Sequence, residues 1–156
     1  MIKLFADGAD KQGILDMYKN PRIDGFTTNP TLMRKAGITD YVTFAKEILD
    51  EITDKPVSFE VFADEYEEME QQALKISKWG ENVYVKIPVM NTKMVPSYEL
   101  IRHLSLKGVK INITAIMTLE QIRLVSESVI GGPSCFVSVF AGRIADTGVD
   151  PVPLMR

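Results

Sequence analysis

Strand-like and helical patterns of apolar residues alternate along the whole chain. Short runs rich in β-branched and aromatic residues predict strands, and apolar positions three or four residues apart predict helices between them. The predicted strands cover residues 2–7, 24–28, 57–63, 83–89, 109–115 and 135–140, and the main helices follow near residues 10, 30, 40, 64, 96 and 118. Repeated strand–helix units indicate a parallel sheet with right-handed crossovers.

Two parallel architectures compete for this pattern, an open doubly wound sheet and a (β/α)8 TIM barrel. The turn after the first strand, residues 7–10 (DGAD), is not the Gly-rich turn expected of a nucleotide-binding sheet, and neither GxGxxG nor GxxxxGK[ST] occurs in the chain. In the fifth strand, alternation places Asn112 and Thr114 on one face, while the other face is apolar through Ala115. We therefore expect an α/β barrel, with polar groups directed at its centre.

Lys86 is a lone charge in the apolar run of residues 83–89. Burial disfavours the charged form of an amine and so favours a neutral, nucleophilic one. Steps of 26 residues from Lys86 reach Glu60, Asn112 and Ser138, each a polar residue in its own strand-like run. This regularity predicts a shared site, although Lys86 could also reach solvent at a strand end or form a structural ion pair with Glu60.

A buried lysine beside carboxylates favours Schiff-base chemistry on a ketone or aldehyde. Asp7 and Glu60 could shuttle the protons that imine formation and bond cleavage require. The single histidine, His103, lies in a predicted helix, and HExxH and CxxC patterns are missing from the sequence. We therefore expect a reaction that needs neither metal nor cofactor.

Composition bounds the class of protein. The chain has 156 residues, of which 46% are hydrophobic, so residues 1–156 are expected to form a single domain. The net charge of −3 gives no global basic field for nucleic acid or an anionic membrane. One cysteine, no signal-peptide pattern and no long apolar run predict a cytoplasmic protein without a membrane span.

Four segments, in order, resemble the transaldolase and fructose-6-phosphate aldolase family. Residues 25–32, GFTTNPTL, look like the family's GxTTNPS segment, and residues 85–88, VKIP, are similar to the strand that bears its Schiff-base lysine. Residues 112–115, NITA, resemble the fifth-strand motif, and residues 138–144, SVFAGRI, resemble SPFVGRI. The resemblance covers essentially the whole chain.

The resemblance implies roles for individual residues. It makes Lys86 the Schiff-base lysine, Asp7 the acid and base at the sugar hydroxyl, and Glu60 with Thr114 the holders of a proton-relaying water. It also implies substrate-binding roles for five residues: Asn29, Asn112, Ser138, Phe140 and Arg143, the last as the phosphate ligand. From the residues alone, Asn29 could simply begin a turn, Asp7 could cap a loop, Arg143 could be a solvated surface residue, and the buried polar groups could be structural.

Glu60 together with Phe140 resembles the transaldolase branch, because the aldolases carry Gln and Tyr at the matching positions. The expected reaction is transfer of a dihydroxyacetone unit from sedoheptulose 7-phosphate or fructose 6-phosphate to an aldose phosphate, as in the pentose phosphate pathway, by an enzyme expected to be a homo-oligomer. Two alternatives stay open: an aldolase that releases dihydroxyacetone, and a catalytically inactive fragment or sugar-phosphate-binding subunit. A full barrel has eight units in about 250 residues; about six are expected here, so the sequence predicts a barrel without roughly its last two units.

Overall fold

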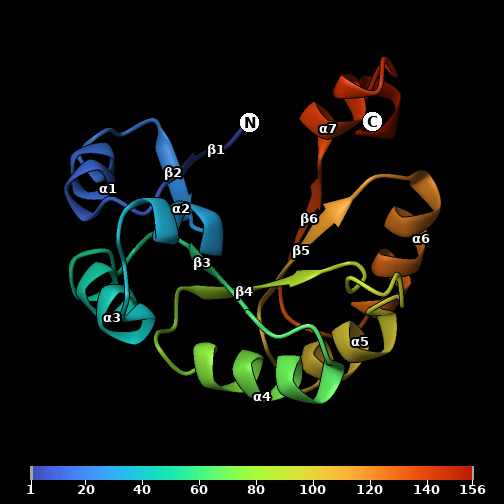
Figure 1. Cartoon of the computed structure of the whole chain (residues 1–156), viewed down its shortest axis with the longest axis horizontal. Helices are drawn as coiled ribbons and strands as arrows, with labels where there is room; N and C mark the ends of the chain where they lie inside the picture. Colours follow the sequence, from blue (N-terminus) through green and yellow to red (C-terminus); the bar gives the residue numbers. More distant parts are fainter. Residues whose placement is uncertain (1, 156) are drawn as a thin grey trace.

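The computed structural model describes residues 2–155 and shows six parallel strands that curl into part of a barrel, with helices on the convex side (Figure 1). The strands are β1 (Leu4–Asp7), β2 (Ile23–Thr27), β3 (Val57–Glu60), β4 (Val83–Pro88), β5 (Ile111–Ile116) and β6 (Phe136–Val139). The helices are α1 (Lys11–Tyr18), α2 (Pro30–Lys35), α3 (Tyr41–Glu51), α4 (Tyr66–Ile76), α5 (Tyr98–Leu106), α6 (Leu119–Ser128) and α7 (Ala141–Asp146), followed by a 3-10 turn, η1 (Val152–Leu154).

The order of the strands decides between the two predicted architectures. Each strand pairs with the next one along the chain, from β1 to β6. A doubly wound sheet would reverse its strand order at a switch point, whereas a barrel adds its strands consecutively around one axis. The predicted α/β barrel class, with six of its units in this chain, is therefore confirmed.

The two faces of each strand differ as the alternation predicts. On the convex face, large apolar side chains pack against the helices and are almost completely buried: Phe26, Phe59, Val85, Ile87, Ile111 and Ile113. The other face, inside the curl, carries the polar groups at one end and aromatic rings at the other. Burial of the convex face is the main contribution that holds the helices on the sheet.

Aromatic side chains fill the inside of the curl near the beginnings of the strands. The rings of Phe5 on β1 and Phe136 on β6 meet edge to face with centroids 5.1 Å apart, and Tyr84 lies 4.4 Å from Phe136. A Cβ on Gly25 would come within 2.3 Å of the Phe5 ring. Glycine at this position therefore makes room for a floor of rings, which we call the aromatic floor (Phe5, Tyr84 and Phe136).

Local capping signals explain several helix starts. Asp10 accepts a hydrogen bond from the Gly13 N–H at 2.7 Å, and Thr118 with Gln121 forms a capping box at the start of α6. Asp64 stands at the start of the helix expected near residue 64, and its residue type predicts an N-cap there; this prediction is wrong. The Asp64 carboxylate instead accepts bonds from the backbone and hydroxyl of Thr92, in the loop after β4, and α4 begins at Tyr66.

Some predicted elements extend beyond the observed ones, because the apolar pattern continues past the residues that form the strand or helix. The third strand ends at Glu60 rather than Ala63, and α5 begins at Tyr98 rather than near Pro96. In β5 the alternation fails at Ala115, whose φ is 59° and where the register with β6 shifts. An extra residue in a strand re-aims the side chains around it, which a strict period of two does not anticipate.

Candidate active site

Lys86 occupies the inner face of β4, between two outward residues, Val85 and Ile87, that are fully buried under the helices. Its side chain is therefore forced into the curl, where the residue is 9% exposed. The Lys86 Nζ donates a hydrogen bond to the Thr28 carbonyl at 2.9 Å and lies 3.2 Å from Glu60 Oε2. The interpretation that the lysine escapes to solvent is wrong, and the ion pair with Glu60 is present.

The strand register explains why these groups meet. Glu60 pairs with Lys86 between β3 and β4, and Lys86 pairs with Asn112 between β4 and β5. Paired residues on adjacent parallel strands point to the same side of the sheet. The 26-residue spacing from Glu60 to Lys86 and Asn112 is thus the length of one strand–helix unit at constant register. Strand β6 departs from it, because Asn112 pairs with Phe136 and not with Ser138.

Asn112 is buried and uses both ends of its amide. Its Nδ2 donates to Ser58 Oγ at 3.1 Å, and its Oδ1 accepts a hydrogen bond from Ser138 Oγ at 2.6 Å. This chain of three side chains links β3, β5 and β6 across the inner face. Thr114 is also buried and lies opposite Pro88 in the register of β5 and β4.

Asp7 and Asn29 lie at the ends of β1 and β2 and bond to their own neighbourhood. Asp7 Oδ1 accepts a hydrogen bond from the Thr27 hydroxyl at 2.7 Å. Asn29 Oδ1 accepts from the Leu32 N–H at 3.0 Å, so that its side chain caps α2. Neither side chain has a hydrogen bond to Lys86 among residues 2–155.

Phe140 and Arg143 follow β6 and are more exposed than the lysine group. Phe140 is 40% exposed at the N-terminus of α7, and the Arg143 side chain is 76% exposed and lies 3.4 Å from Asp146. In Figure 1, α7 stands beyond the end of β6, apart from the helices that cover the sheet. The arginine is therefore free to meet a ligand from solvent.

Tyr41 on α3 reaches the end of β3 from the helical side. Its hydroxyl accepts a hydrogen bond from the Glu60 N–H at 2.8 Å and donates to the Glu60 carbonyl at 3.1 Å. Burial raises the pKa of Tyr41 strongly, and the charge of Glu60 adds to this rise, while the backbone hydrogen bond acts in the opposite direction. The phenol therefore stays protonated and can both donate and accept.

Sequence reasoning did not identify four contributors to this site: the Thr28 carbonyl and the side chains of Thr27, Ser58 and Tyr41. A backbone carbonyl leaves no signal in the residue type. Tyr41 fits the apolar period of its helix and so resembles a core residue. Ser58 and Thr27 did carry a signal, because both are polar positions on the inner face of their strands.

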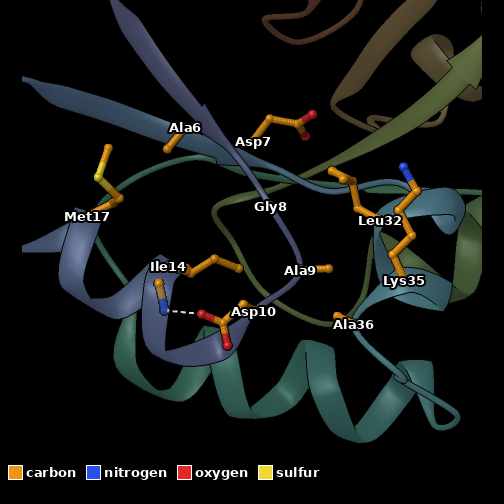
Figure 2. A pocket seen from close by; sticks show the side chains of 11 residues that line it. Ala6, Asp7, Gly8, Ala9, Asp10, Ile14, Met17, Leu32, Lys35 and Ala36 are labelled. Carbon is orange, nitrogen blue, oxygen red and sulfur yellow. Dashed lines mark hydrogen bonds between the residues drawn. The ribbon is translucent and has the colours of Figure 1, made fainter.

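A separate cavity of about 430 Å³ lies between α1 and α2, outside the curl (Figure 2). Ala9, Ile14 and Leu32 are among the side chains that line it. In Figure 2 the Asp7 carboxylate lies on the opposite side of β1 from Ile14. Asp7 is among the residues that line this cavity, so the cavity adjoins the candidate site at Asp7, whereas Lys86 does not line it.

Two further features of the structure concern metal ions and membranes. Among residues 2–155, no group of three or more His, Cys, Asp and Glu side chains gathers in a way that could hold a metal ion. Within the same residues, none of the helices is both long and apolar enough to cross a membrane.

Comparison with known proteins places the chain. A sequence model of the family described as transaldolase/fructose-6-phosphate aldolase matches residues 4–156. The chain belongs to this family. The resemblance predicted from the four motifs is confirmed.

Curated members of the transaldolase/fructose-6-phosphate aldolase family are similar along almost the entire chain. A protein named probable transaldolase from Dehalococcoides mccartyi is 36% identical over 155 residues, which are 99% of this chain and 68% of that protein. Another of that name, from Streptococcus equi subsp. zooepidemicus, is 37% identical over 154 residues, 99% of this chain and 67% of its own length. The chain thus spans about two thirds of the length of these relatives.

Proposed function

We propose that this family member is a transaldolase that moves a dihydroxyacetone unit from a ketose phosphate to an aldose phosphate through an imine at Lys86. One observation supports this most. The Lys86 amine is buried and directed into the curl, with the Glu60 carboxylate 3.2 Å away and the Thr28 carbonyl 2.9 Å away. The names of the relatives, probable transaldolase, agree with it.

The first half of the reaction uses the lysine and the two carboxylates. The Lys86 ammonium gives a proton to Glu60, and the neutral amine adds to the ketose carbonyl to form a carbinolamine. Glu60 returns the proton to the carbinolamine hydroxyl, which leaves as water and gives the iminium. Asp7 takes the proton of the hydroxyl beside the bond that breaks. The electrons of that bond move into the iminium, so that an aldose departs and a dihydroxyacetone enamine remains on Lys86.

The second half reverses these steps on a new aldehyde. The enamine carbon attacks the acceptor carbonyl, and Asp7 returns its proton to the new alkoxide. Water held by Glu60 and Thr114 then hydrolyses the iminium and frees the lysine. The same groups act in both directions, as a transfer between similar sugars requires.

The remaining predicted residues are assigned to binding. Asn112 and Ser138 already bond to each other and present a fixed pair of polar groups to the retained three-carbon unit. Asn29 offers its amide nitrogen, because its oxygen caps α2. Phe140 borders the site, and the exposed Arg143 guanidinium can bind a phosphate through two parallel hydrogen bonds.

Borohydride reduction in the presence of fructose 6-phosphate tests the proposal. We expect a covalent sugar adduct on the peptide that contains Lys86, detected by mass spectrometry, and no adduct in Lys86→Gln. Lys110→Gln is the matched control, because the Lys110 amine donates to the Glu81 carbonyl at the opposite ends of the strands. Folded wild-type protein without an adduct at Lys86 would exclude both the transaldolase and the aldolase function.

A transfer assay with and without an acceptor aldehyde separates transaldolase from aldolase. Glu60 and Phe140 are the pair that favours transaldolase. With fructose 6-phosphate as the donor, we expect product only when erythrose 4-phosphate is present as the acceptor. Release of free dihydroxyacetone at an equal rate without acceptor would support the aldolase instead.

A further inference from the structure

The backbone pairing between strands β2 and β3 stops close to Lys86. They pair at Phe26 with Val57 and at Thr27 with Ser58, and the last backbone bond between them runs from the Thr28 N–H to the Ser58 carbonyl at 3.2 Å. Beyond this bond the chain of β2 turns into α2, which begins at Pro30. The ladder therefore ends one step before Glu60.

A continued parallel ladder would occupy both backbone groups of Glu60. Its N–H would donate to the Thr28 carbonyl, and its own carbonyl would accept from the N–H of residue 30. Residue 30 is a proline and has no N–H to give. Both Glu60 groups consequently lack a partner on β2, and buried backbone groups without partners are strongly disfavoured.

The Tyr41 hydroxyl supplies both missing partners. It accepts from the Glu60 N–H at 2.8 Å and donates to the Glu60 carbonyl at 3.1 Å, which a hydroxyl can do because it is donor and acceptor at once. The ring is held edge-on by three aromatic neighbours: Phe59, Phe62 and Trp79. The hydroxyl thus stands where the next residue of β2 would be.

This replacement leaves the Thr28 carbonyl without its ladder donor, and the Lys86 Nζ bonds to it at 2.9 Å. The ammonium occupies the acceptor that the Glu60 N–H would otherwise take. The Glu60 carboxylate, on the same residue that Tyr41 holds, forms the second contact of the lysine at 3.2 Å. Both partners of Lys86 therefore depend on the separation of β2 from β3.

We propose that Tyr41 is a positioning residue that keeps β2 and β3 apart, so that the Thr28 carbonyl and the Glu60 carboxylate both stay on the Lys86 amine. The proposal rests on the proposed function only in that it makes this amine the reacting group. Without the hydroxyl, the Glu60 N–H competes with Lys86 for the Thr28 carbonyl. The Lys86 amine then loses its fixed position between the Thr28 carbonyl and the Glu60 carboxylate.

Tyr41→Phe tests this with the ring retained. We expect the rate at which borohydride traps the sugar on Lys86 to fall at least about tenfold, the size of one lost hydrogen bond to a charged group, with the apparent KM changed by less than about twofold. The matched control is Tyr18→Phe. The Tyr18 ring also packs edge-on against Phe26, and its hydroxyl donates to Asp54 at 2.7 Å. Removing this hydroxyl should leave the trapping rate unchanged.

Pro30→Ala is the second variant, in case Tyr41→Phe does not fold. It restores an N–H that can compete with Tyr41 for the Glu60 carbonyl and draw β2 toward β3. We expect a smaller loss of trapping rate, about threefold. If every variant that folds has an unchanged trapping rate, the proposal is overturned. Pro30→Ala alone is enough for this test if it is the only variant that folds.

Reductive methylation separates this proposal from the proposed function, because it needs no substrate. In the wild-type protein Lys86 should react more slowly with formaldehyde and cyanoborohydride than Lys110, since it is buried and has two partners. Tyr41→Phe should raise the methylation rate of Lys86 relative to that of Lys110 several-fold, and Tyr18→Phe should leave this ratio unchanged. If the wild type forms no sugar adduct, the proposed function fails, and an equal labelling ratio in wild type and Tyr41→Phe would still overturn the role of Tyr41.

Discussion

The central strands β3, β4 and β5 differ from the edge strands β1 and β6 in how their functional groups are held. Glu60, Lys86 and Asn112 lie on central strands, and their side chains bond to groups from other strands or from the loop after β2. Asp7 lies on the edge strand β1, and among residues 2–155 its side chain bonds only to the adjacent Thr27. The difference teaches that burial between two strands fixes a side chain, whereas a residue on an edge has only half of this restraint.

The edges are nevertheless linked at one end. Phe5 on β1 and Phe136 on β6 touch across the inside of the curl through the aromatic floor. No backbone ladder joins these two strands in the described part of the chain. Side-chain packing at the strand beginnings thus limits how far the edges can separate, while their opposite ends carry the site.

The largest expected difference between centre and edge is in stability. Val85→Ala on β4 removes a fully buried side chain and should lower the free energy of unfolding by about 2 kcal/mol or more, from lost burial and the cavity left behind. The same substitution at Val137 on β6, which is 37% exposed, should cost less than about 1 kcal/mol. Urea unfolding measures both, and equal costs would remove the distinction between the two regions.

The aromatic floor can be tested through the glycine that accommodates it. In Gly25→Ala the new methyl would lie 2.3 Å from the Phe5 ring, so the ring must leave the floor, at a cost of about 1–3 kcal/mol of stability. Phe5→Leu in the same chain should recover part of this loss by relieving the clash. A double-mutant cycle by chemical unfolding shows the coupling, and strictly additive effects would mean that the Phe5 ring does not lie against Gly25.

Alkaline pH probes the central contact of Tyr41. Burial raises the pKa of Tyr41 in the folded state, so above pH 10 the unfolded chain loses this proton first and the folded state binds more protons. The stability contribution is complete below pH 10 and should then fall by up to about 1.4 kcal/mol per pH unit. Tyr41→Phe should show a shallower decline in urea midpoints than wild type, and parallel curves would argue against a buried phenol.

The smallest effect is expected at the ion pair after β6. Asp146→Asn removes the partner of Arg143, but both side chains are exposed, and such pairs contribute less than about 0.5–1 kcal/mol. We expect an unchanged melting temperature and a KM for sugar phosphates that does not rise. A clearly raised KM would instead assign Asp146 a role in orienting the arginine.

The alternation of strands and helices, and the inward direction of Lys86, could be predicted from the sequence. Each follows from a short-range rule: Val85 and Ile87 face the helices, so Lys86 between them must face the other way. Constant unit length also predicted that Glu60 and Asn112 would join it. Strand ends and the helix start near Asp64 were wrong, because partners such as Thr92 come from a loop distant in the sequence.

The sequence thus contains the order of the elements, the face on which each polar side chain lies and the family motifs, because these depend on residues close together in the chain. Three features came from packing between distant elements: the separation of β2 from β3, the bonds of Tyr41 to Glu60, and the closure of the floor by Phe5 and Phe136. A backbone carbonyl such as that of Thr28 becomes a ligand for Lys86 only where a ladder stops. The place where a ladder stops is set by the helix that follows and by the side chain that takes its place, and no local pattern encodes that combination.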